Sequence, residues 1–252
     1  MTATIPTERP MLFSGHMVCP TLDGRKTQTR RAIKNATGDF WDHAAYSPVV
    51  AGGAIQGWRD PEGRLFSEGA PCPVCPHGVP GDRLWVREKW HTCPHCPDGF
   101  IAYGAGGFRQ SVPGVVASNH TCALPLSRKC AAHGWKPSIH MPRWASRITL
   151  EIVDVRVERL NAITQDGALA EGATWTDNGV TEAARMRGQS TAEADKWGQA
   201  KAGWSHEGET DPDHCLGSAR GSFWHLWESI YGPDSWDKNP WVWVITFKKV
   251  TP

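Results

Sequence analysis

The feature that most constrains the fold is a long apolar segment, residues 148–160, whose alternation changes phase partway along. Apolar side chains at every second position are typical of a β-strand with one buried face. Here one alternating set ends at Ile152 and a second, out of phase with the first, begins at Val153. One extra residue near Val153 would reconcile them as a β-bulge, which bends a strand. Sharply bent strands close small barrels, so the segment predicts a core strand of a small β-barrel.

A second strand and two helices are expected to pack around this segment. Residues 241–247 are apolar on both alternating faces, which is typical of a central strand covered on both sides. A short helix is predicted at residues 165–171, with Thr164 as its N-cap and Gly172 as its stop. The last helix, residues 222–231, carries an apolar face expected to pack on the barrel: Phe223, Leu226, Trp227 and Ile230. The predicted fold class is therefore α+β.

The remaining segments give weaker signals. Residues 35–70 show no regular period, and we expect a long surface excursion with one hairpin at residues 60–63. Residues 181–202 predict one or two polar helices. The 252 residues are expected to form one elaborated domain rather than two small ones.

Net charge and hydropathy limit the kinds of molecule that the protein is expected to bind. The net charge is +1, so only a local basic patch could attract nucleic acid, and a small or short substrate is favoured. No apolar segment of membrane-spanning length and no signal-like opening are present, which favours a cytoplasmic protein with no membrane partner. The oligomeric state is left open.

One stretch concentrates charge. Residues 24–31 hold four cations and two hydroxyls in eight positions. They could form a solvated basic loop, or a strip that faces phosphate groups. Alternatively, the neighbouring arginines could lower the pKa of Lys26 and make it a reacting group.

This stretch carries a family resemblance. The pattern Leu-x-Gly-Arg-Lys-Thr-x-Thr-x-Arg, residues 22–31, resembles the signature of ASCH domains, small barrels of the PUA-like superfamily that bind RNA or nucleosides. Residues 80–86, 163–171 and 241–250 resemble other conserved stretches of that domain, and residues 138–144 resemble larger phage-encoded members. The resemblance implies a barrel core at about residues 10–34, 79–90, 136–174 and 218–250, with insertions at about 35–78, 91–135 and 175–217.

The resemblance also implies a chemistry. A small bacterial member of the family removes the acetyl group from N(4)-acetylcytidine with a Lys, a Thr and a Glu, which fall on Lys26, Thr29 and Glu171 of this chain. We therefore expect an amidohydrolase that acts on an acylated exocyclic amine of a cytosine nucleoside or a related base. Lys26 or its polarised water would be nucleophile or base, Thr29 would donate to the oxyanion, and Glu171 would carry protons.

Other residues are expected to bind the substrate: Arg30, Arg31, Trp85, Glu88, His140, Arg143 and Trp144. Two alternatives to the hydrolase remain. The groove could hold RNA, DNA or a modified nucleoside without chemistry, through its arginines. It could also be a ribonuclease, with His140 and Lys26 as the acid-base pair.

The cysteines predict a metal site. Cys72 and Cys75 form one C-P-x-C knuckle, Cys93 and Cys96 form another, and seventeen residues separate the two. This spacing is typical of a structural zinc held by four thiolates, which leaves no open position for catalysis. An alternative tetrad replaces Cys72 and Cys75 by two cysteines of the second insertion, Cys122 and Cys130. A nearby histidine could also replace one thiolate.

Overall fold

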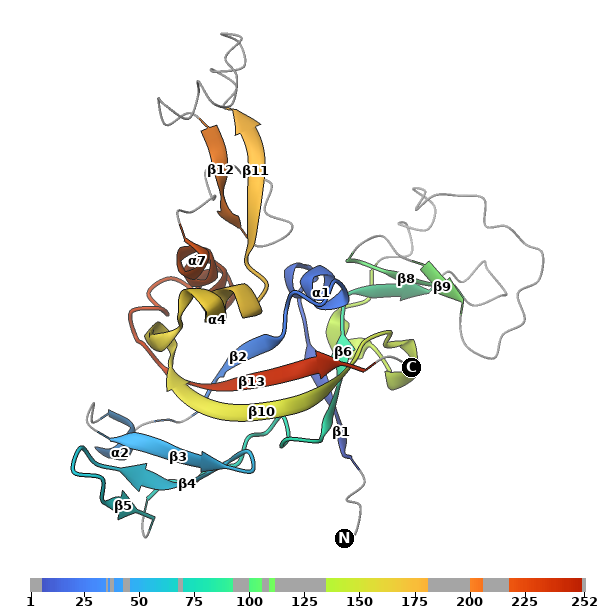
Figure 1. Ribbon diagram of the computed structural model, residues 1–252. Coiled ribbons are helices and arrows are strands. Elements are labelled where there is room, and N and C mark those ends of the chain that lie inside the picture. The colour runs from blue at the N-terminus through green and yellow to red at the C-terminus, as the bar shows by residue number, and fades with distance from the viewer. Residues whose placement is uncertain are drawn as a thin grey trace.

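The computed structural model describes residues 6–34, 36, 39–42, 46–67, 70–92, 100–105, 109–111, 135–180, 200–205 and 218–250. Within these ranges the fold is α+β, as predicted, with several sheets and few helices (Figure 1). No helix in the described part of the chain has the length and apolar character needed to cross a membrane.

The main sheet has five strands in the order β1-β6-β10-β13-β2. Their bounds are β1 Glu8–Leu12, β6 Arg83–Arg87, β10 Thr149–Arg159, β13 Trp241–Lys249 and β2 Gln28–Ala32. β1 and β6 are parallel, and the other neighbours are antiparallel. The two long strands, β10 and β13, curve along the middle of the sheet (Figure 1).

The predicted bulge in β10 is confirmed. Its register against β13 shifts between Ile152 and Asp154, and the intervening Val153 is 51% exposed. Ile152 before the shift and Val155 after it are both buried, so the extra residue restores the inward phase. The central position of β13 is also confirmed, since it lies between β10 and β2 with both faces covered.

Backbone hydrogen bonds do not close this sheet into the predicted barrel among the described residues, where the order ends at β1 and β2. Side chains connect these two edges instead. The Arg31 guanidinium in β2 donates to the Leu12 carbonyl of β1 at 2.7 Å and packs on the ring of Phe13. The curled sheet therefore brings β1 and β2 close together, but the Arg31 side chain connects them in place of backbone hydrogen bonds.

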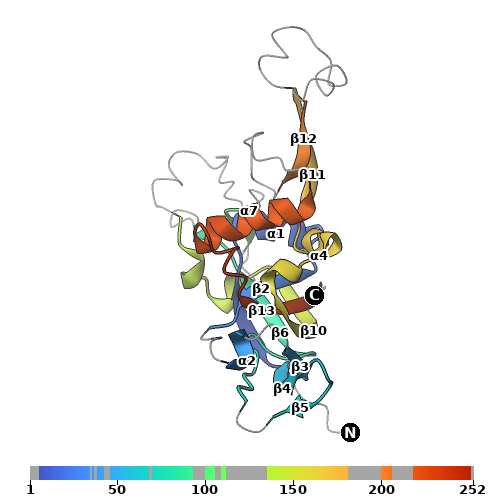
Figure 2. The ribbon, with the colours of Figure 1, turned by 90° about the vertical axis from the view of Figure 1, so that its left-hand side faces the viewer.

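Three α-helices lie on one side of the main sheet: α1 Gly15–Leu22, α4 Gln165–Ala170 and α7 Ala219–Tyr231 (Figures 1 and 2). The predicted ends of α4 are confirmed, because the Gly167 N–H donates to the Thr164 hydroxyl at 3.0 Å and Gly172 has φ +103°. Shorter helical turns are α2 Asp39–Asp42, η1 Ser138–His140, η2 Arg143–Ala145 and η3 Leu160–Ala162.

Three smaller sheets surround this body. They comprise β3 Ser47–Ala51, β4 Ala54–Arg59 and β5 Leu65–Phe66; β7 Trp90–Thr92, β8 Phe100–Tyr103 and β9 Arg109–Ser111; and the hairpin of β11 Thr174–Val180 and β12 Ala200–Ser205. The β11–β12 hairpin projects away from the body (Figures 1 and 2). The helix predicted over residues 181–202 is wrong at 200–202, which belong to β12; residues 181–199 lie outside the described part.

The first predicted insertion is not a surface excursion. The hairpin at residues 60–63 is confirmed between β4 and β5, but Trp41 and Trp58 are buried in the main core. Their rings meet edge-on at 4.7 Å between centroids, and the Trp58 ring also meets Trp241 of β13 at 5.6 Å. Large aromatic rings gain most by burial against one another, which draws this segment onto the sheet.

Replacing Trp58 tests whether this segment belongs to the core. Trp58 is 0% exposed, so Trp58→Ala should lower the free energy of unfolding by about 3–5 kcal/mol, as truncation of a buried aromatic ring does. Trp144→Ala is the matched control because Trp144 is 54% exposed, and about 0.5–1 kcal/mol is expected there. Denaturant unfolding measures both. Equal effects would show that the segment contributes little to the core.

Candidate functional site

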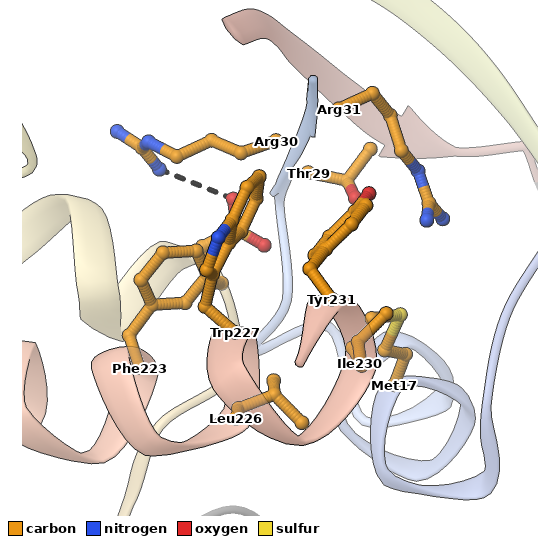
Figure 3. Close-up of a pocket in the computed structure, with 10 residues that line it drawn as sticks. Met17, Thr29, Arg30, Arg31, Phe223, Leu226, Trp227, Ile230 and Tyr231 are labelled. Carbon is orange, nitrogen blue, oxygen red and sulfur yellow. Dashed lines mark hydrogen bonds and ion pairs between the residues drawn. The ribbon is translucent and has the colours of Figure 1, made fainter. Parts of the chain in front are cut away.

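A pocket lies where α1, β2, the end of α4 and α7 meet (Figure 3). It has about 270 Å³ of empty space, which includes open solvent at its mouth. The residues that line it are Met17, Thr29, Arg30, Arg31, Glu171, Phe223, Leu226, Trp227, Ile230 and Tyr231. Two of the three predicted catalytic residues, Thr29 and Glu171, are thus on its surface.

The backbone fixes the basic stretch against the end of α4. Gly24, with φ +78°, ends α1 and turns the chain, and the Lys26 N–H then donates to the Pro20 carbonyl at 2.9 Å. The Thr27 N–H donates to the Ala170 carbonyl at 2.8 Å. Glu171 is the C-cap of α4, so these bonds place it beside Lys26 although 145 residues separate the two in sequence.

Lys26 and Glu171 form a buried ion pair. Lys26 Nζ lies 2.7 Å from Glu171 Oε2, and the side chains are 0% and 2% exposed. Nζ also donates to the carbonyl oxygens of Gln28 at 2.8 Å and of Glu171 at 2.9 Å. Two of the residues to which the resemblance assigns the reaction are thus in direct contact, and all three ammonium hydrogens have acceptors.

Arg30 completes this cluster. Its Nη1 donates to Glu171 Oε1 at 3.1 Å, so each carboxylate oxygen of Glu171 accepts from a different cation. Its Nη2 reaches Glu158 Oε2 at 3.3 Å. The dashed line in Figure 3 follows the contact between Arg30 and the Glu171 carboxylate. Two cations therefore hold the carboxylate in one orientation at the inner end of the pocket.

Burial lowers the pKa of Lys26 from its ordinary value, because removal from water disfavours the ammonium form. The charge and hydrogen bond of Glu171 oppose this, while the charges of Arg31 and Arg30 lower the pKa further. Buried charges contribute little net stability compared with apolar residues of the same size. Their presence beneath a pocket is therefore a mark of a functional site.

Five of the predicted substrate-binding residues do not line this pocket, whereas Arg30 and Arg31 do. The Arg143 guanidinium binds Glu8 at 2.7 Å, and Trp85 lies beneath the guanidinium of Arg87. His140 is exposed in η1. The structure therefore does not bring His140 to Lys26, which is sealed from solvent.

The other two of these five residues, Glu88 and Trp144, have separate neighbours. Trp144 is exposed and meets Trp90 edge-on, and Glu88 is buried rather than on the surface. Both carboxylate oxygens of Glu88 accept from Arg147, at 2.8 and 2.9 Å. Burial raises the pKa of Glu88, and the hydrogen bond and charge of Arg147 oppose that rise. This pair connects β6 to the segment before β10.

The sequence missed the aromatic wall of the pocket, which we define as Phe223, Trp227 and Tyr231. The predicted core-facing side of this helix is confirmed for Phe223, Leu226 and Trp227, which are buried, whereas Ile230 is exposed where it lines the pocket. Tyr231 lies four positions after Trp227 and stacks on it, with centroids 4.2 Å apart. This i, i+4 aromatic spacing was the available signal.

Of the cysteines predicted to bind zinc, the structure describes only Cys72 and Cys75. Cys72 is exposed and Cys75 is buried, and burial raises the pKa of the Cys75 thiol. The backbone of His77 and Gly78 opposes this rise in the pKa. The other predicted ligands, Cys93 and Cys96 or with them Cys122 and Cys130, lie outside the described residues. No metal-like group of three or more side chains occurs within the described ranges, and the zinc stays a prediction.

Removing one member of the Glu88–Arg147 pair should destabilise the protein. Glu88→Ala leaves the Arg147 guanidinium buried without its carboxylate, so the free energy of unfolding should fall by about 3–5 kcal/mol. The double variant Glu88→Leu, Arg147→Met removes both charges and should recover most of that loss. Thermal or denaturant unfolding measures both. A harmless Glu88→Ala would show that the pair is not important for stability.

Comparison of the chain with known proteins finds no matching family model, no matching curated protein and no matching solved structure. The resemblance to ASCH domains therefore stays a prediction. The case for a function rests on the geometry of the pocket.

Proposed function

We propose that the protein is an amidohydrolase that removes an acyl group from the exocyclic amine of a cytosine nucleoside or a related modified base. The observation that carries the proposal is the convergence of Thr29 and Glu171 on one pocket, with Lys26 bonded directly behind Glu171. A buried Lys-Glu pair beneath an aromatic-walled pocket is difficult to explain by stability. It suits a reaction that moves protons beside a planar substrate.

The role of each residue follows from whether its side chain can reach a substrate in the pocket. Lys26 has no free lone pair and is sealed from solvent, so it acts through Glu171 rather than as the nucleophile. A water molecule in the pocket adds to the acyl carbon, and Glu171 takes one of its protons. The Thr29 hydroxyl donates to the oxyanion that forms.

The second half of the reaction breaks the acyl carbon–nitrogen bond. The water oxygen leaves in the carboxylic acid, and the proton held by Glu171 passes to the exocyclic amine of the base. Lys26 and Arg30 keep the Glu171 carboxylate oriented through both steps, each from a different side. Such fixed charges act without reorganisation during the reaction.

Substitutions at the pocket test this mechanism. Thr29→Val keeps the volume in β2 and removes the oxyanion donor, so the rate of acid release from N(4)-acetylcytidine should fall by roughly 10²–10³-fold. Glu171→Gln should lose about 10²–10⁴-fold. Arg143→Ala is the control, since Arg143 lies outside the pocket, and its rate should not change. An inactive wild-type protein would contradict the proposal.

One observation favours a second candidate, a binding module without chemistry. All three ammonium hydrogens of Lys26 are already donated within the fold, as in a purely structural pair. In that case the pocket holds a nucleoside or the end of a short nucleic acid through Arg30, Arg31 and the aromatic wall. Wild type would then bind nucleosides or oligonucleotides without turnover, and the Arg30 and Arg31 contacts would make oligonucleotide binding salt-dependent.

The finer fold assignment belongs to this proposal. The curled sheet with its bulged β10, its central β13 and the basic stretch near the pocket supports a PUA-like barrel of the ASCH type. The side-chain contact of Arg31 with Leu12 would then close the barrel at its open edge. A cytoplasmic location and a structural zinc complete the assignment.

Metal analysis tests the zinc. We expect one zinc per chain in the purified protein, and chelation should lower the melting temperature because structural zinc supplies folding free energy. Cys93→Ser with Cys96→Ser should abolish metal content, since both tetrads use these residues. Cys72→Ser with Cys75→Ser should abolish it only if the paired knuckles are the ligands. Stoichiometric zinc in the Cys93, Cys96 variant would disprove both tetrads.

A further inference from the structure

Three residues that line the pocket carry buried N–H groups without a hydrogen-bond partner in the described part of the chain. Arg30 Nε, Arg31 Nε and Trp227 Nε1 are buried and have no hydrogen-bond partner within the described structure. A buried N–H without an acceptor is unfavourable, so such groups need an explanation. All three are donors, and they belong to residues that line the same pocket. They indicate a ligand that brings acceptor atoms.

The same pocket contains a stacked pair of rings. Tyr231 lies on Trp227 with centroids 4.2 Å apart and an interplanar angle of 27°. Trp227 is buried, whereas Tyr231 is 42% exposed and is the last residue of α7. In the view of Figure 3 the Tyr231 ring lies between Trp227 and Arg31, and Thr29 lines the same pocket. A planar group therefore already occupies the place beside the predicted reacting residues.

A ligand ring cannot enter between two rings that are in contact, since a base sandwiched there would need roughly twice their present separation. The empty space of about 270 Å³ includes open solvent, so the enclosed part is smaller still. Tyr231 is the member of the pair that can leave, because it is half exposed and ends its helix at Gly232. Trp227 is fixed in the core below.

We propose that the face of Trp227 is the stacking platform for a nucleobase, and that Tyr231 covers this platform in the free protein and is displaced by the base. The inference rests on the proposed function, whose pocket it uses. A base in the place of Tyr231 would lie between Trp227 and Arg31, with one edge toward Thr29. An N-acylated cytosine carries acceptors at O2, N3 and the acyl oxygen, which suit the unused Nε–H groups of Arg30 and Arg31. The Trp227 N–H lies in the plane of its own ring and does not reach a base stacked on its face.

Binding measurements on pocket variants test the platform. Calorimetric titration with N(4)-acetylcytidine should give tighter binding to Tyr231→Ala, by about 2- to 10-fold, because no ring has to be displaced. Trp227→Leu should weaken binding by about 5-fold or more, as loss of a stacked base contact does. Trp227→Phe, which preserves more of the core, should weaken it in the same direction. Trp224→Ala is the control on the same helix, outside the pocket, and should not change binding.

These measurements test the stacking role of Trp227 and the covering role of Tyr231 separately. Weaker binding of the nucleoside to Tyr231→Ala would show that Tyr231 contacts the ligand, and would contradict the proposal that Tyr231 covers the platform in the free protein. Unchanged binding to both Trp227 variants, or binding of inorganic phosphate in place of the nucleoside, would overturn the platform. So would the absence of nucleoside binding to every variant. Turnover separates this inference from the hydrolase. If the wild type is inactive but its binding of the nucleoside depends on Trp227, only the hydrolase is refuted. If the wild type is active and its KM does not change with substitution of Trp227 or Tyr231, only the platform is refuted.

Discussion

The rest of the site depends on one electrostatic requirement, the neutralisation of Lys26 inside the protein. An ammonium group that is fully removed from water needs acceptors on every hydrogen and a nearby negative charge. Glu171, the C-cap of α4, supplies the negative charge and two of the acceptors, its carboxylate and its carbonyl, and the Gln28 carbonyl is the third. The contact joins the end of α4 to the start of β2 and leaves the Glu171 carboxylate in the lining of the pocket. Arg30 then completes the coordination of Glu171 from the opposite side.

A second buried pair, Glu88 with Arg147, shows what such a cluster looks like without a pocket. Its bidentate geometry satisfies both carboxylate oxygens, and Arg147 also donates to the Ala105 carbonyl and packs on Tyr103. The lining of the pocket does not include either residue. The two pairs have similar burial, so burial alone does not single out a candidate site. What distinguishes the Lys26 pair is the neighbouring pocket, which Glu171 lines together with residues that carry N–H groups with no partner in the described structure.

The features predicted from sequence were those whose causes are local. The bulge at Val153, the Thr164 cap and the Gly172 stop each depend on a few consecutive residues, and each is confirmed. The contact of Lys26 with Glu171 was also anticipated, but only from the family resemblance, because no local pattern connects them. Long-range packing could not be read in this way. The burial of Trp58 against Trp241 and the pairing of Glu88 with Arg147 depend on neighbours distant along the chain.

The chain order of the pocket has a consequence for how the protein folds during synthesis. Lys26 emerges early, but its carboxylate partner comes 145 residues later and the aromatic wall later still, in α7. β2 gains its sheet neighbour only when β13, the last strand, is made. Contacts between such distant segments form slowly because long loops must close first. A nascent chain that ends before α7 therefore holds Lys26 in an unfinished fold, and the pocket forms only after α7 has been made.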